Sequence, residues 1–172
     1  MSNTIYQFTV PLLRRGMGIL SSYIAIARQH ADSHGLAETG MLSARLAPDM
    51  LPFSGQIQRA SDKAKNGIAR LAQVDAPTFA DNEASFSELD KRLDKTVAFL
   101  DSVKPNLFAG AGKRTIELRF RSVNGAMSGH TYATQVLMPD FYFHVATAHA
   151  ILRNNGAHVG KADYLGKPDY LD

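Results

Sequence analysis

The residues best suited to chemistry in this chain of 172 residues are six histidines, and their spacing limits what they can do. Two imidazoles on one helix can bind a metal together when they stand four residues apart, because they then share a face. His30 and His34 have this spacing, but they end the first predicted helix, where a charged imidazole complements the helix dipole. A capping role is favoured there over a metal pair.

His144 is the most informative single histidine, because it lies in an otherwise apolar stripe of the last predicted helix. The residue one turn further on is Ala148, and His149 is about 100° around the helix from that position. A buried histidine that donates one hydrogen bond to a carbonyl or carboxylate is the favoured interpretation. The alternative is a pocket histidine that acts as a metal ligand or proton carrier, with Asp62 across the bundle.

The pocket predicted around His144 combines polar and aromatic residues of two helices. Its members are His144, Asp62, Gln58, Tyr142 and Phe53. Asp62 can instead pair with Arg59 or Lys65 on its own helix, and Phe53 is core filling first and pocket lining second. Asp62 or Gln58 could replace a missing metal ligand, but a carboxylate and an amide with one imidazole make a poor zinc or nickel site. We therefore expect no metal and no other cofactor, and the sequence assigns no catalytic residue.

Other standard chemistries lack their residues. The absence of cysteine removes disulfides, thiolate zinc sites and a cysteine nucleophile. The G-x-S-x-G, G-x-x-x-x-G-K-[ST] and H-E-x-x-H motifs are absent as well. A basic cluster follows the third helix, at Lys113, Arg114, Arg119 and Arg121. Glu117 interrupts this cluster, so a hairpin edge kept soluble by charge is favoured over a phosphate-binding ribbon.

The charge pattern excludes an extended nucleic-acid surface. Basic residues exceed acidic ones by only three, which gives a weak field. Most basic residues also have acidic neighbours, as in the run Glu88, Asp90, Lys91, Arg92, Asp94 and Lys95. This pattern predicts a solvated, salt-bridged helix face, and no nucleic-acid partner is expected.

Helical periodicity predicts the elements that position these residues. Three segments carry apolar residues at spacings of three and four. They run from Thr4 to His34, from Pro48 to Gln73, and from a Ser85–Glu88 capping box to Pro105. A short extra helix is expected over Glu38–Leu46 and an acidic, proline-containing loop over Asp75–Ala84. Pro11 should kink the first helix or mark its true start, and Gly16-Met17-Gly18 predicts close helix packing.

The period changes in the last third of the chain. Alternation of period two and the tight-turn pair Asn124-Gly125 predict a small β-hairpin over residues 115–128. The fourth helix is expected over Gly129–Asn155, with a bend at Pro139. The predicted fold is all-α: an up-and-down four-helix bundle with a small β-hairpin before the last helix, in which short loops favour antiparallel neighbours.

The chain is expected to form one domain over residues 1–172, because its length suits a single core. Its apolar runs are broken well short of the roughly 20 residues that a membrane span requires, so no membrane partner is expected. No basic n-region followed by an apolar core stands near Met1. A cytoplasmic location is therefore the expectation.

Several separated motifs together resemble a known family. They are Ala44-Arg45-Leu46-Ala47-Pro48-Asp49-Met50, Asp62-Lys63-Ala64-Lys65, Phe141-Tyr142-Phe143-His144-Val145, Ala150-Ile151-Leu152-Arg153, and Gly160-Lys161-Ala162-Asp163-Tyr164-Leu165-Gly166. In this order they resemble the bacterial family of unknown function DUF1993, within the DinB/YfiT-like superfamily of metalloenzyme-type bundles. The similarity extends from Tyr6 to Gly166.

The resemblance implies a DinB-like four-helix bundle, often dimeric, so a homodimer is expected. Better-known DinB-like relatives bind a divalent metal with three histidines, one from the second helix and an H-x-x-x-H pair from the fourth, and some transfer low-molecular-weight thiols. Here the second helix has no histidine and His144 has no partner at position 148, so two of those ligands are missing. We therefore predict a small-molecule binding or interaction protein without that metal site. The alternative is a metal-dependent or thiol-transferase-type enzyme that uses His144.

Overall fold

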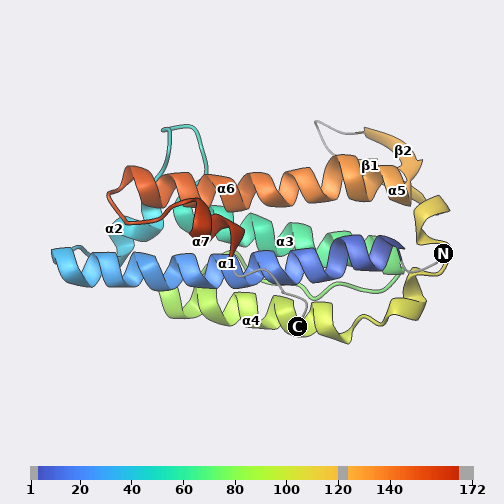
Figure 1. The fold of residues 1–172 in the computed structure, drawn as a ribbon, viewed down its shortest axis with the longest axis horizontal. Coiled ribbons are helices and arrows are strands. Elements are labelled where there is room, and N and C mark those ends of the chain that lie inside the picture. Colours follow the sequence, from blue (N-terminus) through green and yellow to red (C-terminus); the bar gives the residue numbers. More distant parts are fainter. Residues whose placement is uncertain (1–3, 120–123, 167–172) are drawn as a thin grey trace.

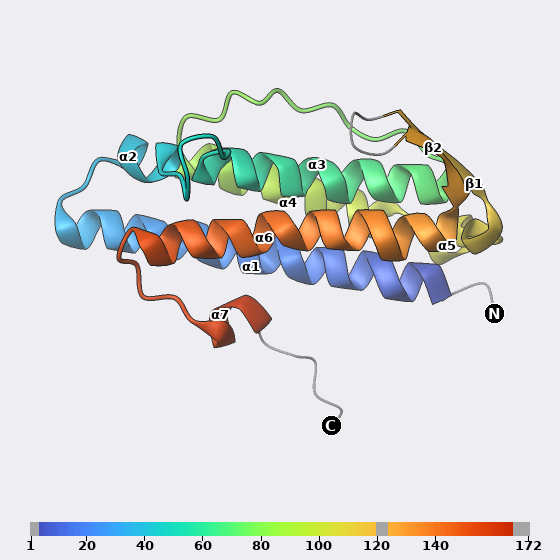
Figure 2. The same cartoon turned by 90° about the horizontal axis from the view of Figure 1, so that it is seen from above.

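The computed structural model describes residues 4–119 and 124–166, and in these ranges four long helices pack side by side (Figure 1, Figure 2). They are α1 (Thr4–His34), α3 (Phe53–Ala72), α4 (Phe86–Ser102) and α6 (Met138–Asn154). Helices α1 and α3 each contact both α4 and α6, so the four form a closed ring around one core. The predicted all-α four-helix bundle is confirmed.

Shorter elements connect the long helices. They are α2 (Glu38–Ser43), two 3-10 turns (Pro105–Phe108 and Ala111–Lys113), strands β1 (Thr115–Arg119) and β2 (Asn124–Ser128), α5 (Gly129–Thr131), a π-helical segment (Tyr132–Leu137) and α7 (Lys161–Leu165). The two strands pair antiparallel at one end of the bundle, which confirms the predicted hairpin. Within the described ranges, every helix falls short of the length and apolarity that crossing a bilayer requires.

One connection differs from a strict up-and-down order. Gln58 of α3 contacts Arg92 of α4, and Ser61 hydrogen-bonds to Thr96. Residue numbers therefore increase in the same direction along both helices, so α3 and α4 are parallel. The loop 73–85 connects them and returns along the outer side of the bundle (Figure 2). A loop of this length reaches about 40 Å when extended, whereas a helix of 20 residues such as α3 is about 30 Å long. The expectation of antiparallel neighbours is therefore wrong at this crossover.

Two glycines allow neighbouring helices to approach closely. A Cβ atom on Gly16 of α1 would lie 2.4 Å from the Phe141 ring of α6. A Cβ atom on Gly67 of α3 would lie 2.3 Å from the Leu137 side chain. Both distances are shorter than any side chain tolerates. The predicted close packing is confirmed for Gly16, whereas Gly18 faces open space.

The start of α3 differs from the prediction. The sequence pattern placed it at Pro48, but Pro48 lies in a turn and the helix begins at Phe53. A helix that began at Pro48 would contain Pro52 in its second turn, where the missing N–H removes a hydrogen bond and the ring clashes with the preceding turn. Pro52 is instead the N-cap residue of α3, outside the helix. In α1 the helix runs from Thr4 through Pro11, so Pro11 does not mark its start.

The hairpin closes at a different place from the one predicted. Asn124 and Gly125 lie in β2, paired with Arg119 and Leu118, so they are not the turn. The connection falls in residues 120–123, which lie outside the described residues, as does Arg121 of the predicted basic cluster. The second strand cannot extend further, because Ser128 caps the next helix by accepting a hydrogen bond from Thr131 N.

Candidate functional site

A cleft of about 280 Å³ lies between α3 and the facing helix, which consists of the π-helical segment and the start of α6. Its walls are Arg59, Asp62, Lys63, Asn66 and Arg70 of α3, and Tyr132, Val136, Leu137 and Asp140 of the opposite side. The α3 residues follow one another at spacings of one, three and four, which places them along one helix face. Among the lining side chains, three cations outnumber two carboxylates by one, and Arg59 also pairs with Asp81, which lies outside the lining.

The wall opposite α3 is built by the π-helical segment Tyr132–Leu137 and the first turn of α6. Pro139 follows this segment directly. Its missing N–H and its ring disturb the turn that precedes it, which agrees with a wider helix at the predicted bend. Such π segments are rare and are found frequently at functional sites. Burial raises the pKa of Tyr132, although a hydrogen bond from Arg70 acts against the shift.

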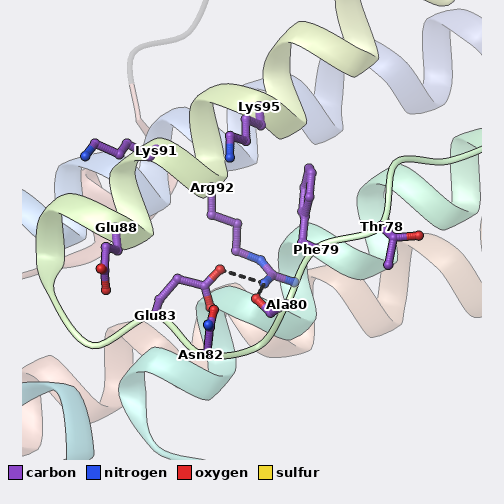
Figure 3. Close-up of a pocket in the computed structure, with 9 residues that line it drawn as sticks. All are labelled: Thr78, Phe79, Ala80, Asn82, Glu83, Glu88, Lys91, Arg92 and Lys95. Atoms are coloured by element: carbon purple, nitrogen blue, oxygen red, sulfur yellow. Dashed lines mark hydrogen bonds and ion pairs between the residues drawn. The ribbon is translucent and has the colours of Figure 1, made fainter.

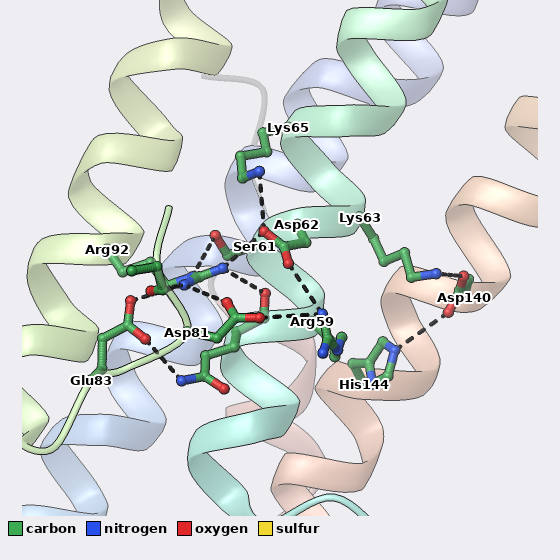
Figure 4. A network of polar contacts seen from close by, with 12 residues as sticks. Arg59, Ser61, Asp62, Lys63, Lys65, Asp81, Glu83, Arg92, Asp140 and His144 are labelled. Carbon is green, nitrogen blue, oxygen red and sulfur yellow. Dashed lines mark hydrogen bonds and ion pairs between the residues drawn. The ribbon is translucent and has the colours of Figure 1, made fainter. Parts of the chain in front are cut away.

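Asp140 connects the cleft to His144 and to α3 (Figure 4). The two residues are four positions apart in α6, and His144 Nε2 lies 3.4 Å from Asp140 Oδ1. Lys63 Nζ lies 2.6 Å from the other oxygen, Oδ2. Burial raises the pKa of Asp140, but hydrogen bonds from His144 and Lys63 outweigh it and lower the pKa below its ordinary value. The carboxylate is therefore held ionised between two cationic or proton-donating side chains.

The other nitrogen of His144 is fixed by a buried glutamine. His144 Nδ1 lies 2.8 Å from Gln56 Oε1, and Gln56 Nε2 donates to the Leu51 carbonyl at 3.0 Å. Because the amide nitrogen is used by Leu51, the amide oxygen faces the ring and accepts from Nδ1–H. This is the hydrogen bond expected of a buried histidine, and it leaves Nε2 directed toward Asp140.

On the other side of α3, Arg92 of α4 holds a second charged cluster (Figure 4). Its side chain is only 2% exposed, and it lies 2.8 Å from Asp62, 3.0 Å from Asp81 and 2.8 Å from Glu83. It also donates to the Ala80 carbonyl at 3.1 Å. Three of these four partners belong to the crossover loop. Arg92 therefore ties the loop to α3 and α4.

The prediction of a solvated face on α4 is wrong for Arg92. Arg92 follows Leu89 by three residues and precedes Thr96 by four, and both of these residues are buried. The helical period thus places Arg92 on the inner face of α4. Asp90, by contrast, does pair with Arg28 of α1 at 3.0 Å, as expected of a salt-bridged outer face.

A second cavity, of about 310 Å³, lies beside this cluster (Figure 3). Its lining consists of Thr78, Phe79, Ala80, Asn82, Glu83, Glu88, Lys91, Arg92 and Lys95. Glu83 is occupied by Arg92, whose hydrogen bond, against the effect of burial, lowers the pKa of Glu83 below its ordinary value. Phe79 covers the Arg92 guanidinium at 5.3 Å. The central charges of this cavity are thus satisfied within the protein, which fits a structural clamp better than a binding site.

Comparison with known proteins establishes the family. The model of a domain of unknown function, DUF1993, matches residues 5–165. The chain belongs to the DUF1993 family. A crystal structure of a DinB family member protein from Shewanella denitrificans is also similar: it shares 31% identity and a TM-score of 0.93, over 99% of this chain and 97% of that chain. No curated protein matches the chain at a comparable level.

The structure does not unite the five residues predicted for the site of this DUF1993 protein. Asp62 lines the cleft and pairs with Arg59 at 3.4 Å and Lys65 at 3.1 Å, the local partners that were expected, but it also pairs with Arg92. Gln58 donates to Glu83 Oε2 at 2.8 Å, on the side of the clamp.

The remaining three predicted residues point elsewhere. The Tyr142 hydroxyl donates to the Leu12 carbonyl of α1, and Phe53 is fully buried in the core. His144 contacts Gln56 and Asp140, and no contact joins it to Asp62. The residues that sequence reasoning missed are Lys63, Asn66, Arg70, Tyr132 and Asp140. The available signal was Asp140-x-x-x-His144, a pair at the spacing that places both side chains on one face.

The residues of the DUF1993 protein do not fit the three-histidine metal site of its better-known relatives. Residues 53–72 of α3 contain no histidine, and Ala148 stands one turn after His144. The α3 side chain that reaches the Asp140–His144 pair is Lys63, and a protonated ammonium has no lone pair for a metal. Within residues 4–119 and 124–166, no three His, Cys, Asp or Glu side chains are grouped as metal ligands.

The other candidate groups lie apart from the cleft. His34 Nδ1 is 2.9 Å from the His30 carbonyl, in the exposed last turn of α1, as expected for a helix end. Arg114 of the predicted basic cluster donates to the carbonyls of Leu71 and Ala109, so its guanidinium faces the protein rather than a phosphate backbone.

Proposed function

We propose that this protein binds a small anionic molecule in the cleft between α3 and α6. The observation that carries the proposal is the charge of the cleft walls, where Arg59, Lys63 and Arg70 stand against Asp62 and Asp140. Charges in a partly enclosed site are screened less than charges in bulk water, so cationic side chains that outnumber the carboxylates of the lining favour an anionic ligand. The cleft volume of about 280 Å³ leaves room for a small carboxylic acid.

Arg70 is the side chain best suited to recognise a carboxylate. A guanidinium presents two parallel N–H groups that match the two oxygens of a carboxylate. Arg70 lies beside the buried Tyr132, whose hydroxyl it contacts, and Asn66 is one turn earlier on the same face. An arginine, a hydroxyl and an amide supply both the charge and the directional hydrogen bonds that a small acid requires.

Binding is favoured over acid–base catalysis at this site. The alternative enzyme would use His144 as a proton carrier, but Nδ1 is held by Gln56 and Nε2 faces Asp140. His144 is also buried and does not itself line the cleft. A general base must reach the proton that it removes from its substrate. The geometry therefore supports a positioning role for His144 behind the cleft wall.

Ligand-observed NMR tests the proposal directly. Tag-free protein is mixed with acetate, succinate and benzoate, and then with the uncharged amides of the same acids. We expect saturation transfer to at least one acid and not to its amide. We expect Arg70→Met to weaken the binding at least tenfold, about 1.4 kcal/mol, because the paired N–H groups are lost. Arg153→Met, at an exposed position near the end of α6, is the matched control and should leave binding unchanged.

Two outcomes contradict the proposal. One is that none of the acids binds to folded protein at millimolar concentration. The other is that acids and amides bind equally, or that Arg70→Met and Arg153→Met have the same affinity, because the cleft charge would then not select the ligand.

We further propose that the protein is a cytoplasmic homodimer. Support for the dimer comes from the family resemblance, in which DinB-like bundles are often dimeric. Sedimentation equilibrium distinguishes the two states: a dimer has twice the chain mass of 18.8 kDa, and a mass of 18.8 kDa at micromolar concentration would exclude it. Fractionation of cells that produce the chain tests the location, with recovery in the soluble cytoplasmic fraction as the expected result.

A further inference from the structure

Asp140 and His144 are spaced like two ligands of one metal ion. Two ligands at about 2.0–2.1 Å from a tetrahedral metal are roughly 3.3–3.4 Å apart. Asp140 Oδ1 and His144 Nε2 are 3.4 Å apart. A direct charge-assisted hydrogen bond between such groups is shorter, at about 2.7–2.9 Å. The Asp140–His144 pair is therefore joined by a long hydrogen bond and at the same time has the spacing of two ligands of one tetrahedral ion.

The support behind His144 is also of the kind that metal ligands have. Metal-binding histidines donate their second N–H to a carbonyl or carboxylate, which fixes the ring and directs the other nitrogen at the metal. Gln56 supplies this acceptor at 2.8 Å from Nδ1, and its own amide is fixed by Leu51. Gln56 is almost completely buried, so the arrangement is built into the core rather than formed at the surface.

The cation beside Asp140 is a lysine side chain. Lys63 reaches across from α3, the helix that faces α6, and its Nζ lies 2.6 Å from Asp140 Oδ2 (Figure 4). Its ammonium supplies one positive charge to Asp140 without any metal. The same charge repels a divalent cation, because like charges a few ångströms apart oppose each other strongly in a partly buried site.

We infer that the Lys63 ammonium takes the place of a metal ion beside Asp140 and His144. The site is a metal-ligand pair with a cation supplied by the protein itself. One substitution, Lys63→His, replaces the ammonium by a third donor and should convert the pair into a metal site. The inference does not rest on the proposed anion binding, which is tested through Arg70.

Titration with cobalt(II) chloride tests the inference, because cobalt bound by imidazole and carboxylate in a tetrahedral site absorbs strongly in the visible range. All proteins carry His34→Ala, so that the exposed His30–His34 pair cannot bind the ion. The parent protein is compared with Lys63→His, with Lys63→Glu as a second donor variant, and with Lys63→Met, which removes the charge without adding a donor. Far-ultraviolet circular dichroism establishes that each variant is folded.

We expect the parent protein to show no saturable cobalt band. Lys63→His or Lys63→Glu should bind one equivalent at least 100-fold more tightly than the parent and at least tenfold more tightly than Lys63→Met. Adding His144→Gln should abolish the band. The inference is overturned if the parent itself binds one equivalent through His144, or if the folded donor variants bind no better than the parent. Binding of one equivalent by the parent through His144 overturns the inference even if every variant misfolds.

Discussion

Replacing Arg92 with methionine should destabilise the protein by about 3 kcal/mol. The substitution keeps a long, flexible, apolar side chain on the inner face of α4 and removes the charge that holds the crossover loop. Removing one partner of a buried ion pair leaves an uncompensated charge, which costs about 3–5 kcal/mol. The expected loss of stability lies at the lower end of this range, because Asp62 retains its ion pairs with Lys65 and Arg59, and Asp81 is 37% exposed to solvent. Most of the loss comes from Glu83, because its carboxylate is only 10% exposed and would lose its charged partner.

Urea denaturation at pH 7 measures this loss as the difference in the free energy of unfolding. A loss of about 3 kcal/mol corresponds to a fall in melting temperature of roughly 6–12 °C for a chain of this size. Lys91→Met, one position earlier on the exposed face, is the control and should change stability by no more than about 0.5 kcal/mol. Glu83→Gln added to Arg92→Met should restore part of the loss, because the amide carries no charge to compensate.

The pH dependence of the Arg92 effect gives an independent check. The pKa of Glu83 is lowered in the folded protein, so its stabilising contribution is present above the ordinary value of about 4.3 and is lost as the pH falls. The difference between the parent and Arg92→Met should therefore shrink below pH 4. A loss smaller than about 1 kcal/mol, an equal loss in Lys91→Met, or no rescue by Glu83→Gln would refute the role assigned to Arg92.

Three further predictions concern packing and titration. Gly67→Val should destabilise by about 1–3 kcal/mol in thermal melts, since its Cβ would overlap Leu137, whereas Gly18→Ala should not destabilise. The pKa of Asp140 is lowered on folding, so parent stability should fall below about pH 4 more steeply than that of Asp140→Asn; parallel acid titration curves would contradict this. Burial raises the pKa of Tyr23, so stability should fall above about pH 10, and Tyr23→Phe should weaken that decline measurably in alkaline urea titrations.

The helices of this bundle could be predicted because helical periodicity directly reports the buried face. Leu89, Leu93 and Leu100 are spaced at four and seven residues, and all are buried in the structure. The N-cap at Ser85 could be predicted in the same way, and in the structure its hydroxyl accepts a hydrogen bond from Glu88 N. These signals are local, since each depends on residues within one or two turns.

The crossover between α3 and α4 could not be predicted from such signals. A loop of the length of 73–85 can either turn back at once or run the length of a helix, and periodicity is the same in both cases. What decides the path is tertiary: Arg92 binds Asp81, Glu83 and the Ala80 carbonyl of the loop. The sequence shows an arginine in an apolar stripe, but not the partners that make its burial possible.

The candidate site could be predicted from the sequence only in part, for the same reason. His144 could be singled out, because a histidine in an apolar stripe is unusual, and Asp140 stands at the spacing of a neighbour on the same face. That Lys63, rather than Asp62, reaches this pair depends on the rotation of α3 about its axis. A difference of one residue along a helix turns a side chain by about 100°, so the choice between adjacent residues requires the three-dimensional packing.

Metal analysis by mass spectrometry most directly tests whether Lys63 supplies the cation at Asp140 and His144. The measurement uses protein purified without a histidine tag and without chelators, from cells grown with added zinc, nickel and cobalt. We predict every divalent transition metal at well below one equivalent per chain. One equivalent of any of them, lost on His144→Gln in a folded variant, would show that a metal ion and not the lysine occupies the site.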